Sequence, residues 1–392
     1  MISFLSQASD LFPYTRDLRR DFHRHPELGF QEHRSGGVIS KELSKLEGIK
    51  VQSGITETGL VGVMDGGKPG KTILLRFDMD ALPVTENTGV EYASEKEGLM
   101  HACGHDGHMA IGLTAARLLN DSRQDLCGTI KFVFQPAEEG LGGAKAMIEE
   151  GILRDPVPDI SLAMHLWNEK PLGWIGITDG PIMSASEAFK VKITGKGGHG
   201  GKPHEAVDPI VAAAGVINAL QSVVSREVPP LDSGVITISS IHGGEAHNVI
   251  PEEVILLGTI RSFTEGTRTL LLERFQEIVE KTASAYLCRA EITIEHISPA
   301  VVNDPGIAGI LRETAAGLFP EAVVDERYRT MVSEDMALMM QDTPGCYCLV
   351  GSANPKKGLD AKHHQPEFNF DEEALIWGSA LLVSAVHKLL QN

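Results

Sequence analysis

Short apolar runs alternate with longer stretches of helical spacing in the first part of the chain. The short runs have the length of β-strands, whereas in the longer stretches apolar residues recur every three or four positions, as on one face of a helix. This alternation is typical of an α/β fold with a mostly parallel sheet covered by helices. The expected strands are 59–64, 72–77, 129–135 and 160–165, and the expected helices are 3–25, 33–46, 106–120 and 142–150.

The order of the expected elements changes after Ser186. From there to residue 297 the pattern predicts a strand, a helix, two strands, a helix and a strand, which is the order of a split, ferredoxin-like α+β unit. The expected strands are 187–195, 235–242, 253–262 and 291–297, and the expected helices are 206–226 and 266–287.

After Pro299 the chain returns to a helical stretch at 307–318, a strand at 346–350 and a long terminal helix from Asp371. We therefore expect residues 1–182 and 299–392 to form one discontinuous α/β domain. Residues 183–298 then form a domain inserted into it. The length of 392 residues suits this organisation, because a domain usually takes about 150 residues.

The composition narrows the possible partners. The formal net charge is −18, so the chain repels nucleic-acid phosphates and anionic lipids, and we expect neither a nucleic acid nor a membrane as partner. The N-terminal MISFLSQASDLF lacks the basic and continuous apolar regions of a secretion signal, and no run approaches the roughly 18 apolar residues of a membrane span. The five cysteines are few and widely spread, which suits a reducing compartment. We expect a cytoplasmic protein.

The segment HACGHDGH, residues 101–108, is the densest group of chemically active residues. His101 and His105 have the i, i+4 spacing that would face one metal ion on a helix. The glycines of the segment indicate instead a loop before a helix, in which Cys103 and His105 face the same site. A thiolate and an imidazole suit zinc or a similar transition metal. A capping loop whose histidines bond to the backbone is an equally good interpretation of this segment taken alone.

Other candidates follow the expected strands. Asp78 and Asp80 follow one strand, Glu138 and Glu139 another, and His165 ends a third. Ligands of open α/β sheets bind beyond the carboxyl ends of strands, so these groups could meet in one crevice. Each is weak by itself, since adjacent glutamates also suit a helix N-terminus and a lone histidine is more often a core residue. The number of metal-capable residues, with His364 in the polar loop AKHHQPEF, favours a metal site.

The inserted segment has its own cluster. The glycine-rich GKGGHGGKPH carries His199 and His204 and lacks the spacing of a phosphate loop. It is either a flexible hairpin tip or a loop that brings His199 to a substrate. HNVIP adds Asn248, and GTIRSF adds Arg261, which suits either a substrate carboxylate or a surface ion pair.

Taken in order, the motifs HACGHDGH, QPAEEGLGGAKAMIEEG, AMHLW, GKGGHGGKPH, NVIP, GTIRSF and HHQPEF resemble those of hippurate hydrolase-like amidohydrolases. DLRRDFHRHPELGFQE and RFDMDALP extend the resemblance over essentially the whole chain. This family includes N-acyl-amino-acid amidohydrolases and plant auxin-conjugate hydrolases, which are relatives of dinuclear metallopeptidases. The resemblance implies a zinc-peptidase-like catalytic domain and an inserted lid through which subunits form a homodimer or tetramer.

The resemblance also implies a role for each matching residue. Two divalent ions per subunit (Zn, Mn, Co or Ni) would be bound by Cys103, His105, Glu139, His165 and His364. Glu138 matches the general base, and His199 matches a lid histidine that reaches the partner's active site in relatives. The substrate-contact positions are Asn248 and Arg261, the positions close to the metals are Asp78 and Asp80, and Glu334 lies in an acidic motif of unassigned role.

The implied reaction is the hydrolysis of an N-acyl-L-amino acid to a carboxylic acid and an amino acid. Phe77 and Met336 depart from the family pattern, as does the glycine-rich turn at His199, but every expected ligand and the base are present. The alternatives are a dipeptidase or aminoacylase of the same clan, a metal-free cysteine hydrolase that uses Cys103, and a binding module without activity.

Overall fold

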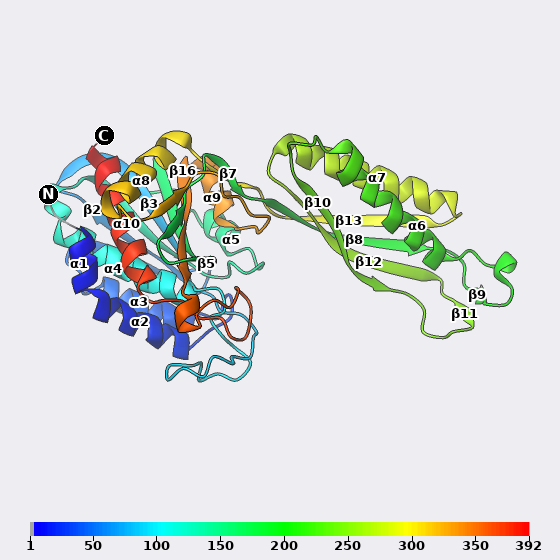
Figure 1. Ribbon diagram of the computed structural model, residues 1–392, viewed down its shortest axis with the longest axis horizontal. Coiled ribbons are helices and arrows are strands. Elements are labelled where there is room, and N and C mark those ends of the chain that lie inside the picture. The colour runs from blue at the N-terminus through cyan, green and yellow to red at the C-terminus, as the bar shows by residue number, and fades with distance from the viewer. Residues whose placement is uncertain (1–3, 392) are drawn as a thin grey trace. The chain divides into compact units, whose positions relative to one another are not determined.

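The computed structural model describes residues 4–391, which form two compact units (Figure 1). Unit 1 contains the chain up to Ile182, 302–329 and the chain from Asp335, and unit 2 contains 183–301 and 330–334. The chain leaves unit 1 along β7 (Gly180–Met183) and returns along β14 (Val301–Asn303). Residues 330–334 belong to unit 2, although the sequence pattern placed them in the discontinuous α/β domain. This segment is held by Ser184, whose hydroxyl donates to the Met331 carbonyl at 2.9 Å.

Unit 1 is built on an eight-stranded mixed sheet whose four central strands are parallel. The order is β1-β2-β4-β3-β5-β16-β6-β15, and the pairs β4–β3, β3–β5 and β5–β16 are parallel. The sheet is therefore largely parallel at its centre, as predicted. Its strands are β1 (Ile49–Ile55), β2 (Gly59–Asp65), β3 (Lys68–Asp78), β4 (Cys127–Gln135), β5 (Ile160–Pro171), β6 (Trp174–Gly176), β15 (Val323–Asp325) and β16 (Gly345–Ala353).

Helices cover both faces of this sheet. α4 and α10 pack against the central strands, and α1, α2 and α8 pack on those two helices. α5 and α9 pack against each other across the sheet from α4 (Figure 1). The helices of unit 1 are α1 (Phe4–Asp10), α2 (Phe12–Arg24), α3 (His33–Leu43), α4 (His105–Asp121), α5 (Gly143–Glu149), α8 (Pro305–Leu318), α9 (Met336–Asp342) and α10 (Ala374–Gln391). The single helix expected over 3–25 is two helices, and its residue 3 lies outside the described residues.

Phe77 shows how the sheet and α4 fit together. Its ring packs against Phe134, with 5.3 Å between ring centroids, on the face covered by α4. A Cβ added to Gly112 of α4 would lie 2.7 Å from Phe77 and 2.9 Å from Phe134. The helix can therefore approach the large Phe77 side chain only because residue 112 is glycine.

Unit 2 is a four-stranded antiparallel sheet with two helices on it. The strand order β10-β12-β8-β13, with the chain order β-α-β-β-α-β, is that of a ferredoxin-like unit, as predicted. α6 begins at Pro209, and the carboxylate of Asp208 caps it by accepting from the Ile210 amide at 2.8 Å. The elements are β8 (Ala185–Thr194), β9 (Gly198–His199), α6 (Pro209–Ser222), β10 (Gly234–His242), β11 (Val249–Ile250), β12 (Glu253–Ser262), α7 (Glu265–Ala285) and β13 (Arg289–Ser298).

Two helical segments, Pro209–Glu227 and Ala374–Gln391, reach the length and mean hydropathy of a membrane span, although no run was expected to approach that length. In the second segment, 67% of the apolar window is buried, and α10 packs on α1, α4 and α8. In the first, 33% is buried, and one face of α6 packs into the core of unit 2. Apolar length in these helices is therefore weak support for a membrane role.

Candidate metal centre

Polar side chains gather beyond the carboxyl ends of the central strands of unit 1. β3 ends at Asp78 and is followed by Asp80, β4 leads to Glu138 and Glu139, and β5 carries His165. Because β3, β4 and β5 run in parallel, these groups reach the same edge of the sheet, where open α/β sheets bind ligands.

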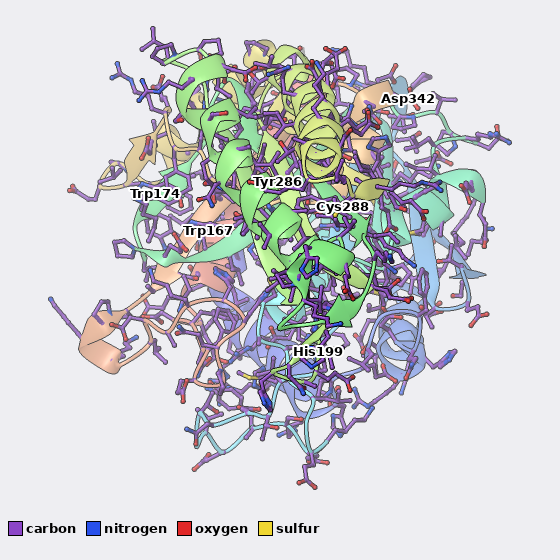
Figure 2. The ribbon with its side chains drawn as sticks, turned by 90° about the vertical axis from the view of Figure 1, so that its right-hand side faces the viewer. Trp167, Trp174, His199, Tyr286, Cys288 and Asp342 are labelled. Atoms are coloured by element: carbon purple, nitrogen blue, oxygen red, sulfur yellow. The ribbon has the colours of Figure 1, made fainter. Side chains whose placement is uncertain are left out.

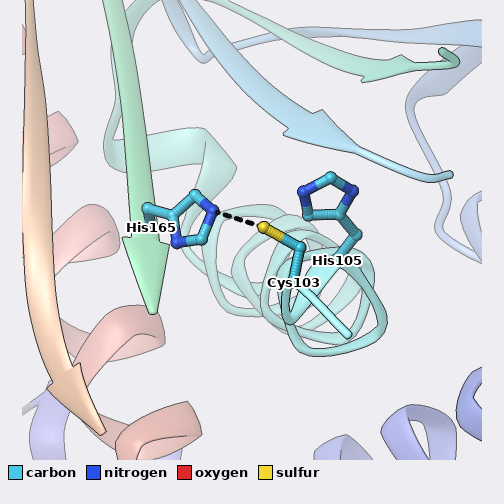
Figure 3. A group of neighbouring side chains, drawn as sticks. All are labelled: Cys103, His105 and His165. Carbon is cyan, nitrogen blue, oxygen red and sulfur yellow. Dashed lines mark hydrogen bonds between the residues drawn. The ribbon is translucent and has the colours of Figure 1, made fainter. Parts of the chain in front are cut away.

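The HACGHDGH segment is a loop that continues into α4. The helix begins at His105, and Gly104 before it has φ 94°, a left-handed conformation that glycine adopts without strain. Cys103 lies outside the helix and points its sulfur toward His165 (Figure 3). His101 also precedes the helix, so it does not have the helical i, i+4 relation to His105. The other interpretation, in which Cys103 and His105 face one site, agrees with the ligand atoms of these two residues, which lie within 4.8 Å of each other.

Five side chains bring potential ligand atoms together. Cys103 Sγ lies 3.5 Å from His165 Nε2, and His364 Nε2 lies 3.2 Å from Glu139 Oε1. The ligand atoms of Cys103, His105 and His165 lie within 4.8 Å of one another, and so do those of Cys103, Glu139 and His364. Since Cys103 belongs to both groups, its sulfur is common to two sets of donors. Unit 1 thus assembles all five residues that the motifs indicated as ligands.

Hydrogen bonds to backbone oxygens fix the orientation of two of these imidazoles. His105 Nδ1 lies 2.9 Å from the Asp80 carbonyl, and His165 Nδ1 lies 2.7 Å from the Leu166 carbonyl. A carbonyl only accepts, so both Nδ1 atoms carry a proton, and in the neutral form of each ring the lone pair is on Nε2. His105 Nε2 is buried and has no hydrogen-bond partner among the described residues. A buried nitrogen left in this state fits a bound cation.

The main-chain N–H and carbonyl of Leu166 orient three histidines. The carbonyl accepts from His165 and from His363 Nε2, at 3.0 Å, and the N–H donates to His108 Nε2, also at 3.0 Å. His108 Nδ1 in turn donates to Asp78 Oδ1 at 2.6 Å. Both ring nitrogens of His108 are therefore engaged, and His108 supports the cluster without a lone pair for a metal.

The carboxylates around the cluster favour a bound cation. Burial by itself lowers the pKa of His105, but Asp78, Asp80 and Glu139 outweigh it and raise that pKa to about 10. Burial, together with the charges of Glu139 and Glu138, raises the pKa of the Cys103 thiol well above its usual value. Both groups thus hold protons that a divalent cation would replace, because metal ligands must be deprotonated.

A buried arginine network lies on the face of the sheet opposite α4. Arg76 donates to Gln135 Oε1 at 2.9 Å, to Asp78 Oδ2 at 2.7 Å and to Asp335 Oδ1 at 3.0 Å. Asp335 also accepts from the Ala144 amide of α5 at 2.9 Å. This network ties the end of β3 to α5 and α9. This network was not predicted from the sequence, although an arginine inside the apolar run TILLRFD is itself a signal of a buried partner.

The expected lid residues lie in unit 2, whereas the five expected ligands lie in unit 1. His199 is exposed on β9, where its Nδ1 accepts from the Gly201 amide at 2.9 Å, and it is labelled in Figure 2. The Nε2 of His199 thus carries the proton. β9, which carries His199, pairs with β11, which directly follows Asn248. His199 and Asn248 therefore lie at the same end of unit 2.

Arg261 lies at the other end of the unit 2 sheet. It pairs with Ser186 on β8, whereas the β9–β11 end of the sheet is marked by the pair Glu253 and Thr194. The half-buried guanidinium donates to the Met331 carbonyl at 2.8 Å and to Ser333 Oγ at 3.3 Å. Burial lowers the pKa of Arg261 from its usual value. Glu334 is buried in the same short segment, 330–334.

Together the α/β fold and this set of thiol, imidazole and carboxylate donors define a metal-dependent hydrolase of the zinc-peptidase type. A model of the peptidase family M20/M25/M40 matches residues 74–388. The chain belongs to this family and is a hydrolase of the amidohydrolase and peptidase kind. The resemblance to hippurate hydrolase-like amidohydrolases is thereby confirmed.

Curated relatives match nearly the whole chain. Thermostable carboxypeptidase 1 of Saccharolobus solfataricus is 38% identical over 366 residues, which cover 92% of each chain. IAA-amino acid hydrolase ILR1-like 4 of Arabidopsis thaliana is 37% identical over 392 residues, covering 98% of this chain and 88% of that protein. N-acetyl-L-cysteine deacetylase of Bacillus subtilis is 38% identical over 375 residues, covering 96% and 88%.

Among solved structures, the YXEP protein of Bacillus subtilis, a dinuclear metal-binding peptidase of the M20 family, is similar with a TM-score of 0.85. It is 32% identical, and the match covers 98% of this chain and 99% of that chain.

Proposed function

We propose that this protein hydrolyses the amide bond of N-acyl-L-amino acids, with two divalent metal ions bound by Cys103, His105, Glu139, His165 and His364. The observation that carries the proposal is the cluster itself, in which one sulfur is shared by two groups of donors within 4.8 Å. The named activities of the Bacillus deacetylase and the Arabidopsis hydrolase, both amide cleavages of acylated amino acids, support the substrate class.

The bound ions would supply the Lewis acidity that makes water nucleophilic near neutral pH and polarises the amide carbonyl. Glu138 shares a group within 4.8 Å with His105 and Glu139, so its carboxylate is within reach of a water at the metal centre. Glu138 takes the proton of this water and then gives it to the leaving amine. Asp80 holds the ring of His105 and accepts from the Glu139 amide at 2.9 Å, so it orients two ligands from outside the cluster.

We propose that Arg261 or Asn248 binds the amino-acid carboxylate and that His199 donates its Nε2 proton to the carbonyl oxygen of the scissile amide. His199 and Arg261 cannot serve one substrate within one subunit. The β12 segment from Glu253 to Arg261 alone spans eight residue steps, roughly 26 Å at 3.3 Å per residue. An N-acyl amino acid has the length of about two residues, roughly 7 Å.

The proposed enzyme is therefore a homodimer, alone or within a tetramer, in which the His199 of one subunit completes the site of its partner. The exposed apolar residues Ile210 and Val211 on α6 suit an interface made by unit 2. The proposed metals are Zn, Mn, Co or Ni, all compatible with these donors. The five cysteines are free thiols, which supports the proposed cytoplasmic location.

We expect His199→Ala to lower kcat by roughly 10²–10³, the usual effect of removing one donor to an oxyanion. His204→Ala, in the same exposed loop, is the control and should retain activity. Mixing inactive His199→Ala with inactive Glu138→Gln should restore activity, because hybrid dimers contain one intact site. Unchanged kcat in His199→Ala, or no recovery on mixing, would place His199 outside the partner's site.

The proposed reaction is tested with N-acetyl amino acids, hippurate, an indole-acyl amino acid and a dipeptide as substrates. We expect the acyl amino acids to be cleaved and the corresponding primary amides, which lack the carboxylate, to be poor substrates. Preference for the dipeptide would instead support a dipeptidase, a second candidate favoured by the name of the Saccharolobus carboxypeptidase. Failure to cleave any substrate by metal-loaded protein would contradict the proposed function.

A further inference from the structure

The N-terminal motif HPELGFQE is close in space to the turn that carries Glu138 and Glu139. A Cβ added to Gly29 would lie 2.9 Å from the Ala137 Cβ and 2.8 Å from Leu141 Cδ1, so only glycine allows the two segments this contact. The proposed mechanism uses no residue of this motif.

The turn itself begins with a strained residue. Ala137 is fully buried and has φ 55°, in the left-handed region that residues with a side chain rarely adopt. Its carbonyl accepts from the Gly143 amide at 3.0 Å. Because Ala137 directly precedes Glu138, its backbone angles decide where the two glutamates point. Such strain persists only where neighbouring contacts hold it.

Glu32 supplies the contact that holds Ala137. Its side chain is completely buried, Oε1 accepts from the Ala137 amide at 2.9 Å, and Oε2 accepts from Thr58 Oγ1 at 2.6 Å. On the other side of Glu138, Asp80 Oδ2 accepts from the Glu139 amide. Two carboxylates thus fix the peptides on either side of the proposed base.

We infer that Glu32 is a positioning residue, which holds Ala137 in its left-handed conformation and thereby aims Glu138 and Glu139 into the metal centre. The inference rests on the proposed function, since it assigns to Glu32 the placement of the proposed base. Glu32 acts through the reach and acceptor oxygens of its side chain. Its negative charge is not required.

Three substitutions separate reach from charge. Glu32→Gln keeps the length and an acceptor oxygen for the Ala137 amide, and its NH2 group can donate to the Thr58 hydroxyl. Burial raises the pKa of the Glu32 carboxyl, so a neutral group is compatible with this position. Glu32→Asp keeps the charge and loses the reach. Glu32→Met keeps the length and loses both acceptors.

We expect Glu32→Gln to stay within about threefold of wild-type kcat and Glu32→Met to lose roughly 10²-fold, as for a catalytic group displaced by about 1 Å. Glu32→Asp should lie between them, and KM should change little in all three. Hydrogen–deuterium exchange of segment 136–143 should accelerate in the Met and Asp variants alone. The visible spectrum of bound Co²⁺ should change with it, because Glu139 moves.

Glu27→Met is the matched control, because Glu27 is also buried and accepts from two backbone amides, those of Arg34 and Ser35. It should lower stability without changing exchange in segment 136–143. Wild-type kcat and exchange in Glu32→Met, or Glu32→Gln as impaired as Glu32→Met, would overturn the inference. If Glu32→Met does not fold, the order of the Gln and Asp variants decides. If the wild-type protein cleaves no substrate, the proposed function fails, and the exchange and Co²⁺ spectra still test the positioning.

Discussion

Glu138→Gln is expected to reduce turnover by roughly 10²–10⁴-fold while both metal ions remain bound. The amide has the size of the carboxylate but cannot take a proton from water or return one to the leaving amine. The five proposed ligands are untouched, so the metal content should stay at two ions per subunit. The measurement is kcat together with metal content by elemental analysis.

Glu149→Gln is the control for this substitution, because Glu149 is exposed on the nearby α5 and contributes to none of the metal-capable groups. It should behave as wild type. A Glu138→Gln variant with near-normal kcat would remove Glu138 from the role of base. Loss of metal in this variant would show instead that Glu138 is a ligand.

Removal of the metal ions is expected to abolish activity, and addition of Zn, Mn, Co or Ni should restore it. Cys103→Ala should lose both activity and tight metal binding, because the Cys103 sulfur belongs to both groups of donors. A free nucleophilic thiol is not expected here, since burial and two glutamates raise the pKa of Cys103 well above its usual value. Cys127→Ala is the control, because Cys127 begins β4 and the site lies beyond the other end of that strand. This variant should keep both activity and metal binding.

Protons and metal compete for this site. The pKa of His105 is raised to about 10, so below that pH the ring is protonated and binding must displace its proton. Metal affinity should therefore rise as the pH rises toward 10, and calorimetry in buffers of different ionisation enthalpy should detect proton release. Activity that survives complete metal removal would contradict the metal mechanism and favour Cys103 as nucleophile.

The sequence predicted the fold class and the residues of the cluster because their signals are local. The alternation of strands and helices follows from apolar spacing. Glu139 and His165 were candidates because they lie at strand ends, and Cys103, His105 and His364 because they lie in polar motifs; the resemblance to the family's motifs joined the five as expected ligands. β1 escaped prediction because it is a largely exposed edge strand with little apolar alternation. The start of α4 at His105 is one residue before the expected start at 106, because the glycines of this segment indicated a loop that continues into a helix.

The supporting contacts of the site could not be predicted, because they join distant segments. Arg76 and Asp335 are 259 positions apart, and Glu32 and Ala137 are 105 apart. In each pair a charged side chain is buried and needs a hydrogen-bond partner. That partner comes from a distant segment, so the local sequence does not indicate it. The left-handed Ala137 carries no sequence signal at all, because alanine normally marks a helix.

The Leu166 peptide has a consequence for how this site tolerates mutation. Three imidazoles take their orientation from main-chain atoms of one residue, and every amino acid except proline offers the same N–H and carbonyl. Side-chain replacement at this position therefore leaves the orienting groups in place, provided that β5 keeps its register with β16. A mutational scan would score residue 166 as an ordinary core position, although proline there would deprive His108 of its donor. The orientation of the three histidines thus depends on the backbone of β5. Substitutions of the side chain at position 166 can therefore accumulate without changing how these histidines are oriented.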